Sequence, residues 1–395
     1  MKVLQVSASY YPALSIGGPV VAVHELNRSL VSIGLDLTVF TTNAHVENIV
    51  TADQEQDVDG VRVTYFSFDK RLEWLGGSGW QYSPALVNAF KKRLKEFDLL
   101  HIVGVWNYPS VMMLRLASRY NMPVLLSPHG SLKPEHFRTK AWKKWLYYQL
   151  LVKPYLGRHV TIQYFTEEEK QESTEYFHFK ASGVAIANGI FLPDISPRTP
   201  QKTLETLYKG KTVILFLGRL HSVKGLEFLM DAFAKLVTRC PSAYLVVAGE
   251  GHPSYVAELK ARCDALKLQD HMTFLGLVKG ESKQRILELA DIYVLPSYNE
   301  AFSMSILEAM AYQLPIVISD RCYFSEIESN QAGYVLMHDQ QQWMKSLDRL
   351  LTDESLRCSM GEKAKALVAS RYRWDIIAET YKSCFQHMFD ERGSK

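Results

Sequence analysis

Short apolar runs alternate with helix-periodic segments along this chain, and the whole alternation occurs twice. In the first half, the apolar runs are "KVLQVS", "DLTVFTT", "VRVTYF", "LLHIVG", "PVLLSP" and "TIQYFT". After the loop "VAIANGIFLPDISPRTPQK", the second set is "TVILFLG", "AYLVVAG", "MTFLG", "IYVLPS", "PIVIS" and "GYVLM". Strands this apolar, each followed by a helical segment, are typical of parallel sheets whose two faces are covered by helices.

This repetition predicts two domains, because 395 residues exceed the size at which a single core usually stops growing. We expect two doubly wound, Rossmann-like α/β domains facing a deep cleft, over residues 1–190 and 205–373. The last helical segment, residues 374–395, has no strand of its own to cover, so we expect it to cross back onto the first domain. Two unrelated domains on a string are the alternative. The helices expected in the first half span residues 20–33, 84–95, 110–119, 135–155 and 167–176.

Composition narrows the class of protein. The five cysteines are scattered without a CxxC spacing, which is typical of reduced residues in a cytosolic protein. The first residues lack the apolar stretch of a signal peptide, and no window approaches the roughly 18 apolar residues of a membrane span. A net charge of +3 is too small to indicate nucleic acid as a partner. We expect a cytoplasmic protein that can still work at the inner face of the cell membrane.

The segment "SYNEAFSMSILEAMAYQLPIVIS" carries two glutamates, Glu300 and Glu308, between two apolar strands. A helix that starts here directs unpaired backbone N–H groups toward the carboxyl edge of the sheet, which is an anion site. The N–H groups of Phe302, Ser303 and Met304 are placed to meet a phosphate. Glu300 could bind a ligand hydroxyl beside it, and Glu308 a second diol such as a ribose. The alternative is one glutamate favoured by the helix dipole and one surface glutamate.

Two cations follow another strand end, in "FLGRLHSVKG". Arg219 and Lys224 flank a short loop before a helix expected to start near Val223. Two positive charges at a strand end are suited to stabilising a departing pyrophosphate, although basic residues are also common on surfaces. The nearby turn "VVAGEG" supplies a tight backbone and is weak evidence alone.

Two further loops follow strands of the first half. Gly17 and Gly18 lie after the first strand and before a helix with Pro19 in its first turn. They let a backbone approach a ligand closely, but the spacing is not a dinucleotide fingerprint, and a plain loop is equally consistent. His129 follows "PVLLSP", where an imidazole could bind a substrate hydroxyl or move a proton; a structural loop histidine is the alternative.

Residues 132–159 form the most basic stretch, with aromatic side chains between the cations. This mixture suits an interfacial helix near anionic lipid, whereas a solvated helix over the sheet is the alternative. Nucleic acid is a possible partner, but the sequence contains no nucleic-acid-binding module that would support it. The cations are Lys133, Arg138, Lys140, Lys143, Lys144, Lys153 and Arg158, and the aromatic residues are Trp142, Trp145, Tyr147, Tyr148 and Tyr155.

The order of these motifs resembles the retaining GT-B glycosyltransferases of family 4, and the resemblance covers essentially the whole chain. The segment with the paired glutamates and "EAMAYQLPIV" is its most specific part. "NG" in the loop between the domains and "RYRW" before the last helix also match. The matching pieces are Gly17–Gly18, His129–Gly130, Arg219 with Lys224, and Glu300 with Glu308.

The resemblance implies that the first domain binds the acceptor and the second the nucleotide-sugar. It implies that Arg219 and Lys224 hold the diphosphate, that Glu300 binds hydroxyls of the donor sugar, and that Glu308 binds the ribose. Backbone near Leu277 would meet the base.

In the first domain, His129 would touch the sugar near its C6 hydroxyl, and the Gly17–Gly18 loop would close over the phosphates. The resemblance further implies a front-face substitution that retains the anomeric configuration. The chain has no DxD triplet, so we expect no metal ion and no cofactor besides the nucleotide-sugar.

The family commonly has Gly where Ala301, Ser303 and Gln313 stand here. Ala301 and Ser303 narrow the backbone freedom of the turn, which puts the detailed phosphate contacts in doubt. Gln313 is expected to affect only the end of the helix.

The leading hypothesis is a hexosyltransferase that uses a nucleotide-diphosphate sugar, UDP-glucose among the common donors, and a lipid-linked saccharide acceptor in surface or extracellular polysaccharide synthesis. One alternative is a transferase with a soluble small-molecule acceptor. Another is a nucleotide-sugar-binding protein without catalysis, which would be expected to have lost some of these side chains.

Overall fold

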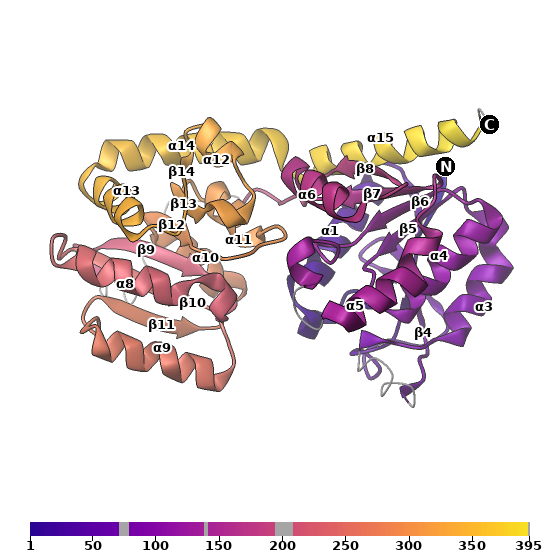
Figure 1. The fold of residues 1–395 in the computed structure, drawn as a ribbon, viewed down its shortest axis with the longest axis horizontal. Coiled ribbons are helices and arrows are strands. Elements are labelled where there is room, and N and C mark those ends of the chain that lie inside the picture. Colours follow the sequence, from indigo (N-terminus) through magenta and orange to yellow (C-terminus); the bar gives the residue numbers. More distant parts are fainter. Residues whose placement is uncertain (71–78, 138–140, 194–207, 394–395) are drawn as a thin grey trace. The chain divides into compact units, whose positions relative to one another are not determined.

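The computed structural model divides the chain into two compact units (Figure 1). Unit 1 consists of Met1–Gly189 and Trp374–Lys395, and unit 2 is Ile190–Arg373. Expectation from sequence had placed these parts at 1–190 with 374–395, and at 205–373. The residues whose structure is described are 1–70, 79–137, 141–193 and 208–393.

A mostly parallel sheet forms the centre of unit 1. In the described part of this unit it has eight strands in the order β3-β4-β2-β1-β5-β6-β7-β8, and only β3 runs antiparallel to its neighbour. The strand order reverses between β1 and β5, so the loops that follow these two strands lie side by side at the carboxyl edge. The strands are β1 (Lys2–Ser7), β2 (Asp36–Thr42), β3 (Glu55–Val58), β4 (Val61–Phe66), β5 (Leu99–Val103), β6 (Val124–Ser127), β7 (Val160–Tyr164) and β8 (Ser182–Ala185).

Helices cover both faces of this sheet. One face packs against α3, α4 and the segment after α5, and the other packs against α1 and α15. The helices are α1 (Gly18–Ser32), α3 (Pro84–Arg93), α4 (Tyr108–Tyr120), α5 (Ala141–Tyr147), α6 (Glu167–Phe177) and α15 (Trp374–Gly393).

Helix α15 belongs to unit 1 although it follows unit 2 in sequence (Figure 1). Its buried side chains recur every three or four positions, which places them on one stripe of the helix. This stripe joins the same apolar cluster as Leu26 and Leu30 of α1. The buried side chains of α15 are Trp374, Ile377, Ala378, Tyr381, Phe385 and Met388.

A ladder of buried polar side chains crosses the sheet beneath α15. The Gln5 amide Nε2 donates to Asn27 Oδ1 at 2.9 Å and lies 3.1 Å from Nδ1 of His101. Because Nδ1 accepts from this amide, the ring proton of His101 is on Nε2, which donates to Ser127 Oγ at 2.9 Å. Burial, and secondarily the nearby His129, lowers the pKa of His101 to about 3. The ladder therefore holds an uncharged histidine in the core.

The described part of unit 2 is a doubly wound sheet whose strands are all parallel. Within residues 208–373, it has six strands in the order β11-β10-β9-β12-β13-β14, so its reversal point lies between β9 and β12. The strands are β9 (Thr212–Leu217), β10 (Ala243–Ala248), β11 (Met272–Gly276), β12 (Ile292–Leu295), β13 (Ile316–Ser319) and β14 (Gly333–Leu336). The helices are α8 (Leu226–Val237), α9 (Pro253–Ala265), α10 (Gly280–Leu289), α11 (Met304–Ala311), α12 (Glu326–Ser329), α13 (Gln340–Thr352) and α14 (Glu354–Arg371).

Three expectations about local structure were wrong. The helix expected over 135–155 is broken: α5 is followed by a π-helical turn at Tyr148–Val152 and a 3-10 turn that contains Pro154. Pro154 lacks the N–H that a continuous helix requires. No strand had been expected at the positions of the short strands β3 and β8, and the last two residues of β8 had been placed in the loop between the domains. The helix after β9 begins at Leu226, and Val223 lies in a 3-10 turn, Ser222–Lys224.

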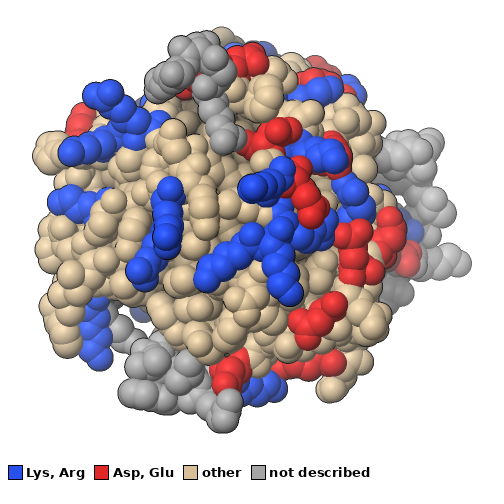
Figure 2. All heavy atoms as spheres, turned by 90° about the vertical axis from the view of Figure 1, so that its right-hand side faces the viewer, with Lys and Arg blue, Asp and Glu red and all other residues tan. Residues whose placement is uncertain are grey.

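The basic segment is less exposed than its composition indicates. Lys133 is completely buried, so it adds nothing to a positive surface. Arg138 and Lys140 lie outside the described residues. On the side of unit 1 seen in Figure 2, Lys and Arg side chains gather over the middle of the face, and Asp and Glu lie beside them. Such mixing of signs is ordinary for a protein surface.

We predict that replacing His101 with Gln weakens the pH dependence of stability. The unfolded chain binds a proton on His101 near pH 6.5, whereas the folded chain does so only near pH 3. Stability of the wild type is therefore lost as the pH falls below 6.5, by about 2 kcal/mol at pH 5. Urea unfolding at pH 7 and pH 5 should show His101→Gln less stable than wild type at pH 7, with the gap narrowed by that amount at pH 5.

Glu169 works in the opposite direction, because burial raises its pKa to about 7 and the folded chain gains protons first. Its contribution is common to both proteins and cancels in the comparison. If the difference in unfolding free energy between wild type and His101→Gln is the same at pH 7 and pH 5, the lowered pKa of His101 does not make stability depend on pH.

Candidate active site

The loops after β9 and β12 meet at the reversal point of unit 2. Gly225, just before α8, has φ +68°, and a Cβ at this position would lie 2.0 Å from the carbonyl oxygen of Pro296. Only a glycine permits this approach. Tyr298 N–H donates to Val223 O at 2.7 Å and fastens the same two loops. The close packing brings the end of the first loop, Lys224, beside the second.

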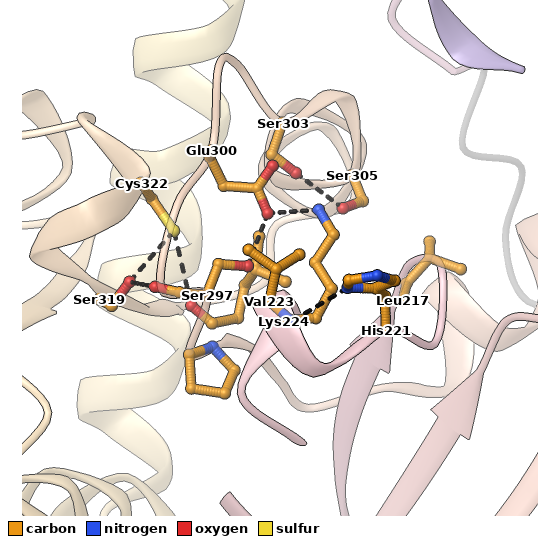
Figure 3. A network of polar contacts seen from close by, with 12 residues as sticks. Leu217, His221, Val223, Lys224, Ser297, Glu300, Ser303, Ser305, Ser319 and Cys322 are labelled. Atoms are coloured by element: carbon orange, nitrogen blue, oxygen red, sulfur yellow. Dashed lines mark hydrogen bonds and ion pairs between the residues drawn. The ribbon is translucent and has the colours of Figure 1, made fainter. Parts of the chain in front are cut away.

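Lys224 and Glu300 form an ion pair at this junction (Figure 3). The Lys224 ammonium contacts Glu300 Oε1, and Ser297 Oγ donates to the same oxygen at 2.6 Å. The Glu300 side chain is only 8% exposed, against 20% for Lys224. A carboxylate this buried requires a cation and hydrogen bonds to remain in place. The sequence had assigned the two residues to different ligand groups, and the structure places them in contact.

The floor beneath this pair is built from uncharged groups. Ser319 Oγ donates to the carbonyl oxygen of Ser297, and Cys322 Sγ lies 3.6 Å from Leu295 O as donor. Burial, and then the charge of Glu300, raises the pKa of the Cys322 thiol to about 12. This cysteine therefore stays protonated and unreactive. Sequence analysis identified neither Ser297 nor Ser319.

Helix α11 begins at Met304, one turn after Glu300 (Figure 3). Ser303 stands at its N-cap with φ −95° and ψ 111°, and its hydroxyl lies 3.0 Å from Ser305 Oγ, which is 2.6 Å from Tyr293 OH. The first N–H groups of a helix have no partner within it. The first turn of α11 therefore directs donors and a partial positive charge toward the Lys224–Glu300 pair.

The three positions at which this chain lacks the family's usual glycine differ in their backbone conformation. Ser303 occupies an ordinary extended conformation, and Ala301 is not among the residues with positive φ, so neither position demands glycine. Gln313 does have a left-handed backbone, with φ +60°. A non-glycine residue there carries strain, but Gln313 lies past the end of α11, away from its first turn.

The other residues of unit 2 singled out from sequence follow strands β9 and β11 or lie on α11. Arg219 is exposed directly after β9, and among the described residues it has no hydrogen bond or ion pair. Glu308 lies on α11 and pairs with Lys283 Nζ at 2.9 Å. Leu277, 47% exposed, follows Gly276, whose φ is +70°. Lys283 was missed from sequence because it comes from a distant helix, α10.

Of the site residues predicted in unit 1, His129 lines a cavity of about 290 Å³, and Gly17 and Gly18 lie in sequence between two of its lining residues. His129 has φ +51° and packs edge-on against Phe165 at 5.2 Å. Burial lowers the pKa of His129 to about 4, so its imidazole is uncharged at neutral pH. Gly17 has φ +99° and ends a 3-10 turn, Leu14–Ile16, and Gly18 is the first residue of α1. Ile16 and Pro19 line the cavity beside His129.

Neither unit shows a metal centre or a membrane span in its described part. Among the described residues, no three His, Cys, Asp or Glu side chains are grouped as metal ligands. No described helix combines the length and apolar character needed to cross a membrane.

Two family models match the chain, one for each half. Residues 17–189 match the glycosyl transferase 4-like domain, and residues 198–367 match glycosyl transferases group 1. The first match contains Gly17, Gly18 and His129. The second contains Arg219, Lys224, Glu300 and Glu308.

Individual relatives extend this comparison. An uncharacterized glycosyltransferase of Methanocaldococcus jannaschii is 35% identical over 186 residues, so this alignment spans less than half of either chain, 46% of each. The phosphatidyl-myo-inositol mannosyltransferase of Mycolicibacterium smegmatis is 28% identical over 75% of this chain and 74% of that protein. The solved structure of Anabaena HepE in complex with UDP has a TM-score of 0.75 at 18% identity, covering 98% and 100% of the two chains. These likenesses confirm the expected fold class of two Rossmann-like, parallel-sheet domains.

We predict that the Lys224–Glu300 pair contributes to stability before any ligand binds. Replacing Lys224 with Met leaves the buried carboxylate without its cation, which should cost about 3 kcal/mol of unfolding free energy. Glu300→Gln in the same chain should recover a large part of this loss, because no charge is then buried alone. Chemical denaturation of the two single variants and the double variant measures the coupling.

The Lys283–Glu308 pair is the matched control, since its side chains are 36% and 21% exposed. Its coupling should stay below about 1 kcal/mol. Equal coupling energies for both pairs would show that burial does not distinguish them.

Proposed function

We propose that this chain, which belongs to the GT-B glycosyltransferases with a GT4-like first domain, moves a hexose from a nucleotide-diphosphate sugar to a saccharide acceptor with retention of the anomeric configuration. The observation that carries this proposal is the Lys224–Glu300 pair, held at the reversal point of unit 2 beside the first turn of α11. A cation, a carboxylate and the backbone N–H groups at the start of a helix together suit a sugar linked to a diphosphate.

Each part of the donor then has a counterpart in unit 2. The diphosphate would lie against Arg219, Lys224 and the N–H groups of Phe302, Ser303 and Met304. Hydroxyls of the hexose would be bound by Glu300. Arg219 is exposed and Lys224 has one carboxylate contact, so both have donor capacity left for phosphate oxygens. The ion pair keeps Lys224 extended toward this position before the donor arrives.

The nucleoside would extend toward the other end of α11. Glu308 lies one turn further along the helix, where its carboxylate could accept from both ribose hydroxyls. Its contact with Lys283 would hold this carboxylate in place from the second side. Backbone near Leu277 would meet the base. UDP-glucose is the proposed donor, in keeping with the related Anabaena HepE, which has been solved with UDP-glucose.

The proposed chemistry is a front-face substitution. The bond from the sugar C1 to the phosphate oxygen breaks, and the acceptor oxygen bonds to C1 on the same face. The proton of the acceptor hydroxyl passes to the departing phosphate oxygen, so no protein base is required. Arg219 and Lys224 stabilise the negative charge that develops on the diphosphate, and losing one such contact typically costs about 10²–10³ in rate. These two cations supply the positive charge, so we propose a reaction without a metal ion or other cofactor.

Unit 1 would contribute its uncharged histidine and its glycine loop. A neutral His129 can donate one hydrogen bond and accept another, which suits a hydroxyl near C6 of the transferred sugar. The Gly17–Gly18 loop, which joins the cavity-lining residues Ile16 and Pro19, would cover the phosphates. Exclusion of water protects the donor from hydrolysis.

We propose a lipid-linked acceptor and contact with the inner face of the cell membrane, for a role in surface or extracellular polysaccharide synthesis. The support is an exposed apolar face on residues 142–150, in which Trp142 is 69% and Leu150 61% exposed. Lys143 stacks over the Trp142 ring at 5.4 Å and keeps positive charge beside it. Aromatic and basic side chains in this arrangement favour the headgroup region of an anionic membrane. The name of the mycobacterial relative also contains a lipid, phosphatidyl-myo-inositol.

We predict that UDP and UDP-glucose raise the melting temperature of the purified protein more than GDP, ADP and their sugars do. A ligand at a hundredfold excess over its dissociation constant adds about 2.7 kcal/mol of stability. Glu308→Gln should abolish most of the shift by UDP, because it removes the charged acceptor for the ribose hydroxyls. The matched control is Glu258→Gln, an exposed glutamate on α9, which should leave the shift unchanged.

Release of UDP from UDP-glucose should accompany binding, and NMR of the product should show the donor's anomeric configuration kept. Binding without any nucleotide release, with or without acceptors, would favour the non-catalytic alternative. Absence of a shift with every nucleotide would contradict the donor site itself.

We predict that the protein binds vesicles containing phosphatidylglycerol and that Trp142→Ser with Leu150→Ser weakens this binding at least about fivefold. The control pair is Ile49→Ser with Tyr120→Ser, which removes two side chains of unit 1 that are also exposed, by 68% and 48%. Vesicle co-sedimentation at low and physiological salt measures the partition. Equal loss in both pairs, or no binding by the wild type, would favour a soluble acceptor.

A further inference from the structure

The Gly17–Gly18 loop, residues 11–19, makes few contacts of its own. Only one of its residues, an alanine, is buried. The hydrogen-bonded N–H groups of residues 13–17 reach carbonyl oxygens only two or three positions back in the chain. Ile16 and Pro19 nevertheless line the cavity of unit 1. The position of the loop therefore depends on contacts at its two ends.

Tyr10 and His24 connect these two ends. Tyr10 OH lies 2.9 Å from His24 Nδ1, and both side chains are buried, with exposed fractions of 1% and 2%. Tyr11 stacks on the same imidazole, with ring centroids 4.3 Å apart and ring planes within 6°. The chain just before the loop is fixed by Gln81, which lines the same cavity and donates to Ser9 Oγ at 2.9 Å. The loop is thus closed at its base by the contact between Tyr10 and His24.

Asp59 binds the His24 ring from the other side. Its Oδ2 lies 2.9 Å from His24 Nε2, and its own side chain is 54% exposed. Asp59 and Gly60 form the turn between β3 and β4, with φ values of +53° and +85°. Two residues with positive φ are typical of a type I′ hairpin turn, in which Asp-Gly is a favoured sequence. The hairpin therefore fixes the place from which Asp59 reaches α1.

The carboxylate of Asp59 determines the direction of the hydrogen bonds that follow. A carboxylate only accepts, so His24 carries its proton on Nε2 and accepts at Nδ1 from the Tyr10 hydroxyl. The Tyr10 oxygen accepts from Asn27 Nδ2 at 3.1 Å, and Asn27 exchanges two hydrogen bonds with Gln5 of the buried polar ladder. Without the carboxylate, His24 could take the other tautomer, in which the Tyr10 O–H has no acceptor.

We infer that Asp59, His24 and Tyr10 are positioning residues, which act as a latch that holds the Gly17–Gly18 loop in place. The inference rests on the transferase function proposed above, in which this loop covers the phosphates of the donor. The three latch side chains are not among the described residues that line the cavity, so they act through the loop and not by contact with a substrate. A loop that is ordered beforehand loses less conformational entropy when it covers a ligand.

The first readout is hydrogen exchange of backbone amides in the full-length protein without ligand. Asp59→Gly keeps a favoured type I′ sequence, Gly-Gly, but removes the acceptor for His24 Nε2–H. Exchange of the hydrogen-bonded amides in residues 13–17 should rise about three- to tenfold, the value of one hydrogen bond, while β6 exchanges as in wild type. Asp59→Asn keeps the turn preference and an acceptor oxygen, so it should restore most of the protection.

Tyr10→Phe removes the same latch from its other end and should have the same local effect. The matched control is Tyr164→Phe on β7. Tyr164 is likewise buried, at 2% exposure, and its hydroxyl forms a side-chain hydrogen bond with Thr174. This control should leave exchange of the Gly17–Gly18 loop unchanged.

The second readout is turnover of UDP-glucose, followed as UDP release with a panel of octyl glycosides as acceptors. Asp59→Gly and Tyr10→Phe should lower kcat about three- to tenfold, in proportion to the loosening of the loop. The increase in melting temperature caused by UDP should stay as in wild type, because the donor site proposed above lies in unit 2. Asp59→Asn and Tyr164→Phe should both keep the wild-type kcat.

The outcomes distinguish the latch from the transferase function. If the wild type turns over no nucleotide-sugar, the transferase function fails, and the role of the latch in the reaction fails with it, whatever the exchange rates. If the wild type is active but loop exchange stays unchanged in Asp59→Gly and Tyr10→Phe, the latch is overturned alone. An equal rise of exchange in the loop and in β6 would show a merely structural role, and faster loop exchange with an unchanged kcat would overturn the positioning role.

Discussion

Parallel strands end at a common edge, and this constraint produces both candidate binding sites. In unit 2 the strand order reverses between β9 and β12, so the loops carrying Lys224 and Glu300 meet although 76 residues separate them. In unit 1 the reversal lies between β1 and β5, and the cavity with Ser7 and Asn107 opens there. The position of each site follows from the topology of its sheet and not from a local sequence motif. Each exists because the sheet leaves a crevice where two crossover connections depart in opposite directions.

The two sites solve different electrostatic problems. Unit 2 holds a buried carboxylate, which is stable there only because Lys224 and Ser297 contact it and because Gly225 lets the two loops pack closely. Unit 1 instead keeps two buried histidines uncharged. His101 in the polar ladder and His129 at the cavity both have pKa values lowered by burial, to about 3 and about 4. A diphosphate needs the first environment, and a polyhydroxylated acceptor is compatible with the second.

Much of this could be predicted from sequence, because strand ends and helix starts leave local signals. The apolar run "IYVLPS" followed by "YNEAF" located the turn before α11, and the observed helix begins at Met304, the last of the three residues whose N–H groups had been assigned to a phosphate. Local signals could not reveal which side chains meet across the sheet. Ser297, Lys283 and Gln81 reach their sites from separate elements, and nothing in their own neighbourhoods marks them. Composition alone gave a wrong expectation for Lys133, which was included in the basic surface segment but is fully buried. Whether a cation is exposed depends on tertiary packing.

The proposed front-face substitution is compatible with the arrangement of the titrating groups. If the departing phosphate takes the acceptor proton, the protein needs no side chain whose pKa lies near neutrality at the point of reaction. His129, whose pKa burial lowers to about 4, would be a poor base at pH 7 but a constant hydrogen-bonding partner. Glu169, the buried carboxylate whose pKa is raised to about 7, contacts the reaction only indirectly: it accepts from Phe165 N–H at 2.7 Å, and the Phe165 ring supports His129. Packing against Phe165 therefore fixes the neutral imidazole, as the hydroxyl contact proposed for it requires.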